Sequence, residues 1–277
     1  MKATTAIGIG GAMACLLLAV IMEGGQPMGL LNIPAFIIVV GGTGMATLAS
    51  TNIEQLKRIP ALYKTAIAGS SLEPGTAIRQ MVALAERARR DGLLALEEDL
   101  AQLDDGFTRK GMQLVVDGTD SDLVRGILQS ELDGMSQRHG ANAHLFATAG
   151  GFAPTLGILG TVLSLVHVLE NLSDPGSLGH SIAGAFLATL YGVGSANLIF
   201  LPVSNKLKEI STEEVVYREM QIEAILSIQA GDNPRMIAEK LATFVAPDAR
   251  GSDEAEKPTR AASDGAADEP APLEEAA

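Results

Sequence analysis

Four long stretches without a charged side chain most constrain what this chain can fold into. They cover residues 3–22, 30–53, 145–169 and 181–204 and form two pairs, because no Lys or Arg separates the members of either pair. A helix of about 20 apolar residues crosses the roughly 30 Å hydrocarbon core of a bilayer, and a helix buried in a soluble core rarely stays uncharged for so long. The sequence therefore predicts an all-α polytopic membrane protein with four transmembrane helices.

The positive charges indicate how these spans are oriented. Of the 20 Lys and Arg residues, 11 lie between Lys57 and Arg138 and eight lie after Asn205, whereas the two short connections carry none. Lys and Arg concentrate in the loops that stay in the cytoplasm. We therefore expect a multi-pass protein of the plasma (inner) membrane with both termini in the cytoplasm. No small-residue cleavage pattern follows the first span, so we expect a retained helix and not a signal peptide.

The predicted organisation has five segments. Residues 1–52 form a first transmembrane hairpin, and residues 145–204 form a second one. Residues 53–144 form a helical cytoplasmic domain between spans two and three, and residues 205–245 form C-terminal helices. Residues 246–277 are acidic and contain few large apolar side chains, so they cannot offset the entropy lost on ordering and are predicted to be a disordered tail.

Local patterns place helix boundaries in the cytoplasmic part. Apolar residues recur at helical spacing after the second span and predict a stalk that continues it, with a kink at Pro60. A further helix is predicted from about Ser121, with Asp120 or Ser121 as its N-cap. Gly231 predicts the end of the long helix that follows the fourth span, and Pro234 suits the first turn of a last short helix.

The residue types that carry enzymatic chemistry are not grouped along this chain. The four histidines show no metal-ligand spacing, Cys15 stands alone, and no nucleotide-binding loop or nucleophile–base pair is evident. The formal net charge of −13 owes much to the acidic tail, so it does not by itself indicate a basic partner. We therefore expect no enzymatic activity, no bound cofactor, no metal and no nucleic-acid partner.

Spans three and four each present a stripe of small residues. In span three the stripe comprises Ala153, Gly157, Gly160, Thr161 and Ser164, and in span four it comprises Ala185, Ala188, Thr189, Gly192, Ser195 and Ala196. Small residues let helices approach closely, and hydroxyl groups can form hydrogen bonds across the contact. Such a surface either packs ordinarily, grips another helix, or lines a narrow wet path. Because none of the spans contains Asp, Glu, Lys or Arg, an ion path here needs an acidic group from a second polypeptide.

Several sequence runs resemble the MotA/PomA family of flagellar stator subunits. Residues 151–162 (GFAPTLGILGTV) resemble the third span of that family, and residues 188–192 (ATLYG) with Asn197 and Pro202 resemble the fourth. Residues 116–120 (VDGTD) and 231–235 (GDNPR) look like two further family blocks. The likeness covers about residues 1–245, with the same order of four spans and the same loop length.

This resemblance implies an assembly and a function. Five such chains, a homopentamer, would surround two copies of a MotB-like single-span subunit, whose Asp binds the ion and whose periplasmic domain grips peptidoglycan. Inward flow of protons, or of sodium ions, would turn the ring and drive the rotor of the bacterial flagellar motor. The transported H+ or Na+ is the cargo, and no cofactor is implied.

The resemblance also assigns roles inside the membrane. Pro154 and Pro202 match prolines that are functionally important in the family, and a proline leaves one backbone carbonyl free as a hinge or polar contact. Thr161 and Thr189 match positions that line the ion route. Ala188 and Tyr191 belong to the same partner-facing set; sodium-driven relatives carry a hydroxyl where this chain has Ala188, which favours protons. The expected ion-path and partner-facing residues are therefore Pro154, Thr161, Ala188, Thr189, Tyr191 and Pro202.

In the cytoplasm, the charged residues of one segment resemble the family's rotor contact. Arg89, Arg90 and Glu97 match residues that meet opposite charges on a FliG-like protein of the rotor switch ring. Exposed ion pairs contribute only about 0–1 kcal/mol, so these charges would act in steering and register more than in affinity. Taken without the resemblance, the same charges are typical of a solvated helix face.

The sequence leaves two other functions open. An ExbB/TolQ-type energy-transducing channel subunit of the inner membrane belongs to the same superfamily, but those proteins typically have three spans and an outside N-terminus. The extra first hairpin and the charged block from Arg89 to Glu97 favour the stator. A membrane scaffold that conducts no ions is the third possibility, and it would need the small-residue stripes only for packing.

Overall fold

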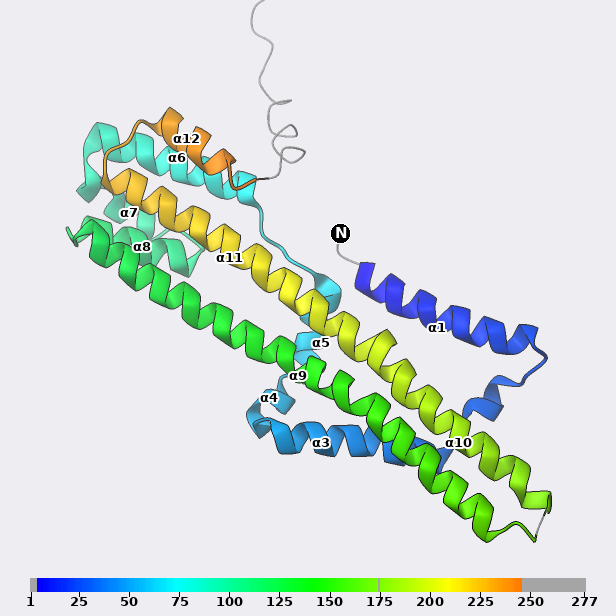
Figure 1. The fold of residues 1–277 in the computed structure, drawn as a ribbon. Coiled ribbons are helices and arrows are strands. Elements are labelled where there is room, and N and C mark those ends of the chain that lie inside the picture. The colour runs from blue at the N-terminus through cyan, green and yellow to red at the C-terminus, as the bar shows by residue number, and fades with distance from the viewer. Residues whose placement is uncertain (1–3, 174, 246–277) are drawn as a thin grey trace, which may run out of the picture.

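Two antiparallel helical rods form the long axis of the molecule (Figure 1). The first rod is the single helix α9 (Ser121–Glu170). The second runs through α10 (Pro175–Ser195), a π-helical turn η4 (Ala196–Phe200) and α11 (Leu201–Gln229). At 1.5 Å per residue, α9 extends about 75 Å. Both rods continue without interruption past residues 144 and 204, so each rod joins a candidate span directly to the charged end of the molecule.

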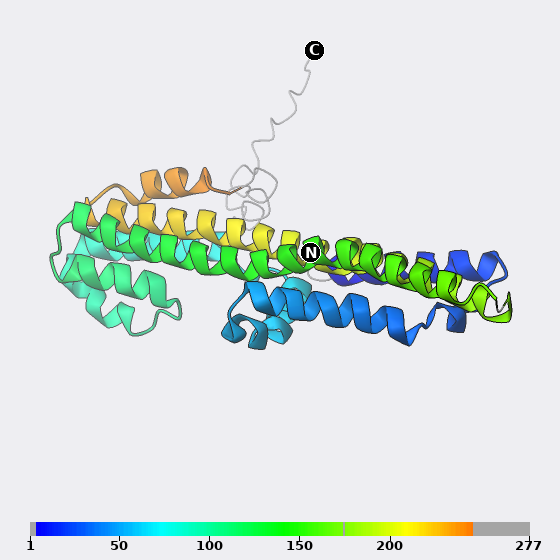
Figure 2. The same cartoon turned by 60° about the horizontal axis from the view of Figure 1, so that its bottom comes forward.

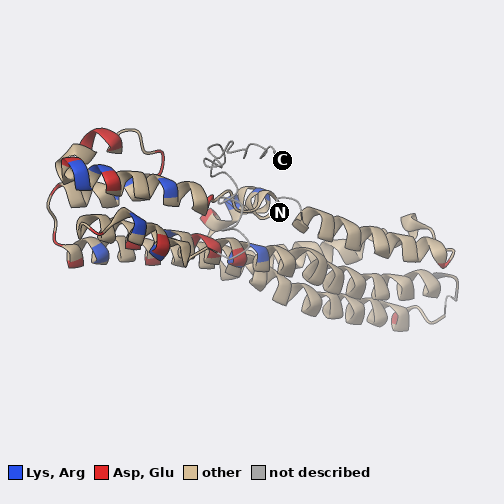
Figure 3. Ribbon diagram, turned by 90° about the horizontal axis from the view of Figure 1, so that it is seen from above, with Lys and Arg blue, Asp and Glu red and all other residues tan. Residues whose placement is uncertain are grey.

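The computed structural model describes residues 4–173 and 175–245, and within them all regular structure is helical. Four helical stretches are long and apolar enough to cross a membrane, as the sequence predicts. Figure 3 shows that the Lys and Arg positions of these residues lie along one half of the molecule, whereas the half with the apolar stretches carries none. The acidic tail, residues 246–277, lies outside the described residues, so its predicted disorder stays a prediction.

The first two spans flank the pair of rods. Span one is α1 (Thr4–Met22), which touches α11, α5 and η4. After a short 3-10 turn, η1 (Pro27–Leu30), span two follows as α2 (Ile33–Phe36), a π-helical turn η2 (Ile37–Gly41) and α3 (Gly42–Ser50), and it packs on α9 and α10. Figures 1 and 2 show α1 and α3 as separate helices beside different parts of the rod pair.

The predicted stalk after span two is wrong. Thr51 adopts an extended conformation and ends α3, and the chain restarts as α4 (Ile53–Lys57) and α5 (Ile59–Ala68). Pro60 occupies the first turn of α5, where its missing N–H costs no hydrogen bond, and so it begins a helix instead of kinking one. The apolar spacing that suggested a stalk serves to pack α5 against the rods, with the Tyr63 and Phe146 rings edge to face at 5.1 Å.

The charged end of the rods carries a small helical domain, which we call the head domain. It comprises α6 (Pro74–Asp91), η3 (Leu93–Leu96), α7 (Glu97–Leu100), α8 (Gly106–Val116) and α12 (Pro234–Ala242), packed around the ends of α9 and α11. Large side chains from all these helices make one buried core, among them Leu96, Met112, Leu128, Ile225, Ile237 and Leu241.

The helix boundaries predicted for this part are confirmed. Asp120 is the N-cap of α9, and its carboxylate accepts a hydrogen bond from the Asp122 amide at 2.9 Å. Gly231, with φ of +75°, follows the end of α11 in the left-handed conformation that glycine tolerates best. Pro234 lies in the first turn of α12.

Candidate functional site

Two threonine hydroxyls meet where α9 and α10 cross inside the apolar half of the molecule. The Thr161 and Thr189 Oγ1 atoms lie 2.5 Å apart. Thr161 Oγ1 also lies 3.0 Å from the carbonyl oxygens of Gly157 and Ala185. Both threonines are half-buried. The structure therefore brings together, from two different helices, two residues to which the family resemblance assigns a place in the ion route.

One arrangement of the two hydroxyl protons satisfies every contact of this pair. Thr161 has a single proton, which it can share between the carbonyls of Gly157 and Ala185. The Thr189 hydroxyl must then donate its proton to Thr161 Oγ1. The lone pairs of Thr189 Oγ1 stay available to accept a hydrogen bond or to coordinate a cation. The threonine pair is thus a polar acceptor on a helix pair that carries no charge of its own.

Glycines allow the two helices to approach this closely. A Cβ atom added to Gly192 would lie 2.5 Å from the Ala153 carbonyl oxygen and 2.9 Å from the Gly157 Cα atom. A Cβ atom added to Gly157 would lie 2.9 Å from the Ala188 carbonyl oxygen. These are backbone atoms that cannot turn aside, so only glycine fits at both positions. The small-residue stripes of the sequence are therefore the contact between spans three and four.

Ala188 lies inside that contact. Its side chain is fully buried, and it packs against Ala35 and Val39 of span two. A Cβ atom added to Gly160 of α9 would come within 2.9 Å of the Ala188 Cβ atom. In this chain the residue thus fills a three-helix junction, and its predicted effect on the choice between protons and sodium ions stays a prediction.

Tyr191 uses its hydroxyl to hold the start of span two. The phenol donates to the Leu30 carbonyl and accepts a hydrogen bond from the Asn32 amide at 2.9 Å. Its ring meets Phe36 edge to face, with 6.4 Å between the centroids. Asn32 in turn caps α2 by accepting a hydrogen bond from the Ala35 amide at 3.0 Å. These contacts position span two against span four; a role of Tyr191 in ion flow stays a prediction.

The two prolines occupy different kinds of helical backbone. Pro154 lies inside α9, which stays helical through it, so the carbonyl four residues earlier, that of Gly150, loses its usual amide donor. Pro202 lies in the first turn of α11, directly after the π-helical turn η4. Single π-helical turns occur often at functional sites, and neither η2 nor η4 is evident in the apolar periodicity of the sequence. The functional importance of both prolines stays a prediction.

Span two contributes two polar groups that the sequence reasoning missed. The side chains of Thr43 and Thr47 are only 2% and 5% exposed. Their hydroxyl oxygens have no hydrogen-bond partner among the described residues. The residues lie one helical turn apart on α3, which packs on α9. Threonine is common in packed membrane helices, so the sequence held no signal that set these two apart.

The predicted rotor-contact residues lie together at the tip of the head domain. Arg89 and Arg90 are in the last turn of α6, and Glu97 begins α7. Arg90 pairs with Asp91 at 3.1 Å, whereas Arg89 and Glu97 make no ion pair within residues 4–173 and 175–245. Between them the Leu94 side chain is 74% exposed. The tip thus offers one positive and one negative group without a local partner.

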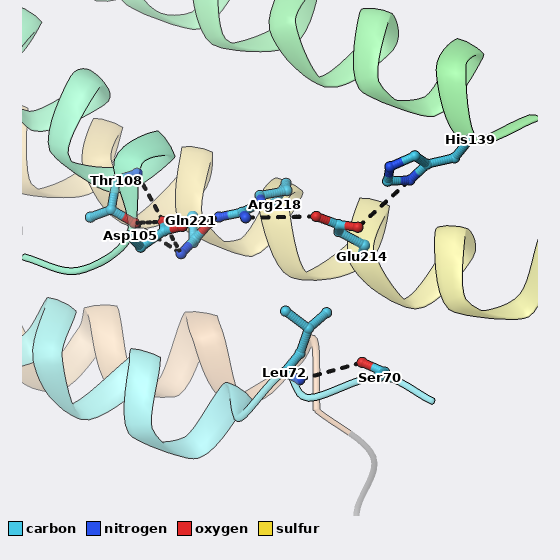
Figure 4. A network of polar contacts seen from close by, with 8 residues as sticks. All are labelled: Ser70, Leu72, Asp105, Thr108, His139, Glu214, Arg218 and Gln221. Atoms are coloured by element: carbon cyan, nitrogen blue, oxygen red, sulfur yellow. Dashed lines mark hydrogen bonds and ion pairs between the residues drawn. The ribbon is translucent and has the colours of Figure 1, made fainter. Parts of the chain in front are cut away.

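A polar network joins the start of α8 to α11 at the head domain (Figure 4). The Arg218 guanidinium on α11 donates to Asp105 Oδ1 at 2.7 Å and to Gln221 Oε1 at 2.8 Å. Gln221 donates to Asp105 Oδ2 at 3.0 Å and to Thr108 Oγ1 at 2.9 Å. The guanidinium also lies over the Phe107 ring, 5.1 Å from its centroid. The residues of α8 and those of α11 stand more than 100 positions apart in sequence, so no local pattern could reveal the network.

Two opposing effects set the pKa of Asp105. Burial raises the pKa, but hydrogen bonds from Thr108 and Arg218 outweigh it and hold the pKa below its ordinary value. A carboxylate whose pKa is lower in the folded state stabilises the fold at pH values above its unfolded pKa of about 3.9. That stabilisation is lost as the pH falls through the folded-state pKa. Asp105 therefore contributes to acid sensitivity of the head domain.

We expect Asp105→Asn to lower the thermal midpoint at neutral pH and to flatten its decline between about pH 5 and pH 3. The substitution removes the charge-assisted hydrogen bond to Arg218, a loss of roughly 1.5–3 kcal/mol. Circular dichroism melting of the detergent-solubilised chain measures both effects. Asp133→Asn, at an exposed position of α9, is the control and should keep the wild-type profile. An unchanged midpoint in Asp105→Asn would contradict the assigned contribution.

The chain is similar in sequence to known proteins over most of its length. Residues 99–220 match the MotA/TolQ/ExbB proton channel family. The chain is 43% identical over 216 residues to motility protein A of Borreliella burgdorferi, covering 78% of this chain and 83% of the relative. It is 35% identical over 246 residues to motility protein A of Bacillus subtilis, covering 88% and 91%.

A solved structure extends the similarity to three dimensions. A chain of the flagellar MotAB stator complex from Bacillus subtilis superimposes with a TM-score of 0.84 at 35% sequence identity. The match covers 90% of this chain and 98% of that chain. The fold of this chain therefore matches that of a chain of the stator complex over nine-tenths of its length.

Proposed function

This chain belongs to the motility protein A branch of the MotA/TolQ/ExbB proton channel family, and from this premise we propose that it is the ion-conducting stator subunit of a bacterial flagellar motor. Inward ion flow past α9 and α10 would be converted into torque on the rotor. The observation that carries the proposal is the Thr161–Thr189 pair, a polar acceptor at the glycine contact of two uncharged helices.

The ion site would be completed by a second polypeptide. None of the four spans contains Asp, Glu, Lys or Arg, and a dehydrated ion in the bilayer needs a charged or strongly polar ligand. The single span of a MotB-like subunit would supply its Asp opposite the free lone pairs of Thr189. A proton or cation bound by that Asp would find the hydroxyl as a neutral second ligand. We propose protons as the coupling ion, since Ala188 offers no further hydroxyl.

The two rods would carry the resulting movement to the rotor. The Thr161–Thr189 contact and the head domain lie on the same two continuous helical rods, so a rotation of the ring that is driven at the ion site would also move the tip. Arg89 and Glu97 at the tip would meet opposite charges of a FliG-like switch-ring protein. The same proposal places both termini and the head domain in the cytoplasm, where Lys and Arg concentrate, and assembles five copies around two partner chains.

A clean deletion of the gene in its native host tests this function. We expect paralysed cells that still build normal filaments, with swimming restored by the wild-type gene on a plasmid. Filament staining and tracking of single cells measure the two properties together. The host should lack any other stator pair, so that normal swimming of the deletion strain would refute the proposal. A nutrient-uptake or envelope defect with intact swimming would instead identify an ExbB/TolQ-type energy transducer.

A further inference from the structure

A groove of about 630 Å³ runs along the base of the head domain. One wall is α11 with Val216, Tyr217 and Met220. The opposite wall is Leu72, in the segment between α5 and α6, and Pro74 at the start of α6. Phe244 and Val245, the last described residues after α12, close one side. Figure 4 shows Ser70 and Leu72 on this segment, facing the helix that carries Arg218. The lining is mostly apolar, and Val216 is 38% exposed.

The walls of the groove are held by internal contacts. The Arg218 guanidinium lies 5.6 Å from the centroid of the Tyr217 ring, and the network of Asp105 fixes that guanidinium in turn. The Leu72 amide donates to Ser70 Oγ at 3.4 Å in the opposite wall. A preformed apolar groove of this kind suits the apolar face of an amphipathic helix.

The charged residues around the groove are acidic. Glu209 and Glu213 are the charged residues that line it, and Glu73 lies next to Leu72 on the opposite wall. Glu209 pairs with Lys206 at 2.9 Å, whereas Glu213 makes no ion pair with a described residue. These carboxylates favour an occupant that is cationic as well as amphipathic. Residues 246–277, with nine Asp and Glu against three Lys and Arg, do not have that charge.

The groove lies close to the point where the second rod leaves its apolar stretch. The fourth apolar stretch ends at Ser204, and Glu209 and Met220 follow it on the same helix. At 1.5 Å per residue, these two positions lie roughly 7 Å and 24 Å beyond that end. A segment that leaves the membrane beside the rods reaches this distance from the membrane within a few residues. The occupant is therefore expected next to a transmembrane helix of its own chain.

We propose that the groove binds the cationic juxtamembrane segment of the single-span partner subunit. A single-span protein whose large domain lies outside the cytoplasm carries its Lys and Arg on the cytoplasmic flank of the span. Such a segment supplies the charge that Glu209 and Glu213 attract, and its apolar face covers Val216 and Tyr217. The contact holds the partner's span at a fixed height beside Thr189. The inference rests on the proposed stator function.

Cysteine cross-linking in living cells tests this contact. Cys15, the single native cysteine, is replaced by Ala, and Glu213→Cys is combined with cysteines placed one by one along the partner's cytoplasmic segment. We expect a cross-link between the two chains at helical intervals of the partner. Glu219→Cys, on the same helix but outside the groove lining, is the matched control and should give no such pattern.

Charge reversal supplies a second, independent readout. In the Glu213→Cys background, Glu209→Lys should lower the cross-linked fraction roughly tenfold, because it sets a like charge against the partner's cationic segment. Glu219→Lys should leave the fraction unchanged. Cross-links between two copies of this chain, or to its residues 246–277, would overturn the proposal. If the deletion strain is paralysed but Glu213→Cys never links to the partner, the groove inference fails and the stator function stands.

Discussion

Replacing Gly192 by Val should abolish swimming in a strain that depends on this chain. The new Cβ atom would lie 2.5 Å from the Ala153 carbonyl oxygen, whereas nonbonded heavy atoms pack at about 3.5–4.0 Å. The helices must therefore move apart by about 1 Å. Overpacking of this kind costs about 1–3 kcal/mol, and the separation also breaks the 2.5 Å contact between Thr161 and Thr189.

Gly194→Val is the matched control for this substitution. Gly194 lies two residues further along the same helix, and a Cβ atom added there meets nothing within 4 Å. We expect this variant to swim and to accumulate in the membrane like the wild type, whereas Gly192→Val loses swimming even at equal abundance. Immunoblots of membrane fractions and tracking of tethered cells measure both. Rotation at wild-type speed in Gly192→Val would show that the helix contact has no role in torque.

Much of the fold follows from patterns that act locally in the sequence. Uncharged stretches of membrane length, the Asp120 cap, and the turn at Gly231 are determined by a few neighbouring residues, and the structure contains all of them. The same holds for the small-residue stripes, because a helical repeat places them on one face. The prediction of a stalk after span two was wrong because apolar spacing indicates a buried face but does not show whether Pro60 lies within a helix or begins one.

The candidate site depends on contacts that local patterns do not encode. That Thr161 and Thr189 are among the ion-path residues came from a family resemblance, but their meeting requires the crossing of two helices. The links of Arg218 to Asp105 and of Tyr191 to Leu30 join residues more than 100 positions apart. Burial of Thr43 and Thr47 without a partner likewise depends on which face of α3 meets α9, so composition could not reveal it.

Thr189→Val should stop ion flow while it leaves the fold intact. Valine has the shape of threonine but cannot accept a hydrogen bond, so the acceptor opposite the proposed partner carboxylate disappears. Loss of one hydrogen bond in a membrane protein costs only about 0.6 kcal/mol on average, too little to unfold the chain. We expect at least about a tenfold fall in motor speed, which corresponds to about 1.4 kcal/mol at the barrier for ion passage.

Two further variants distinguish the effect of the hydroxyl group from the effect of side-chain packing. Thr189→Ser keeps the hydroxyl and should retain most of the motor speed. Thr161→Val removes the group that receives the Thr189 proton, and its motor speed should lie between those of Thr189→Ser and Thr189→Val. Thr155→Val is the control: its exposed hydroxyl donates only to the Phe152 carbonyl at 2.8 Å, so its loss should not slow the motor. Bead rotation on single motors, combined with proton influx into vesicles that contain both subunits, gives the measurement. If Thr189→Val rotates at wild-type speed, ions pass this chain without the threonine pair, and the acceptor must lie elsewhere on the two helices.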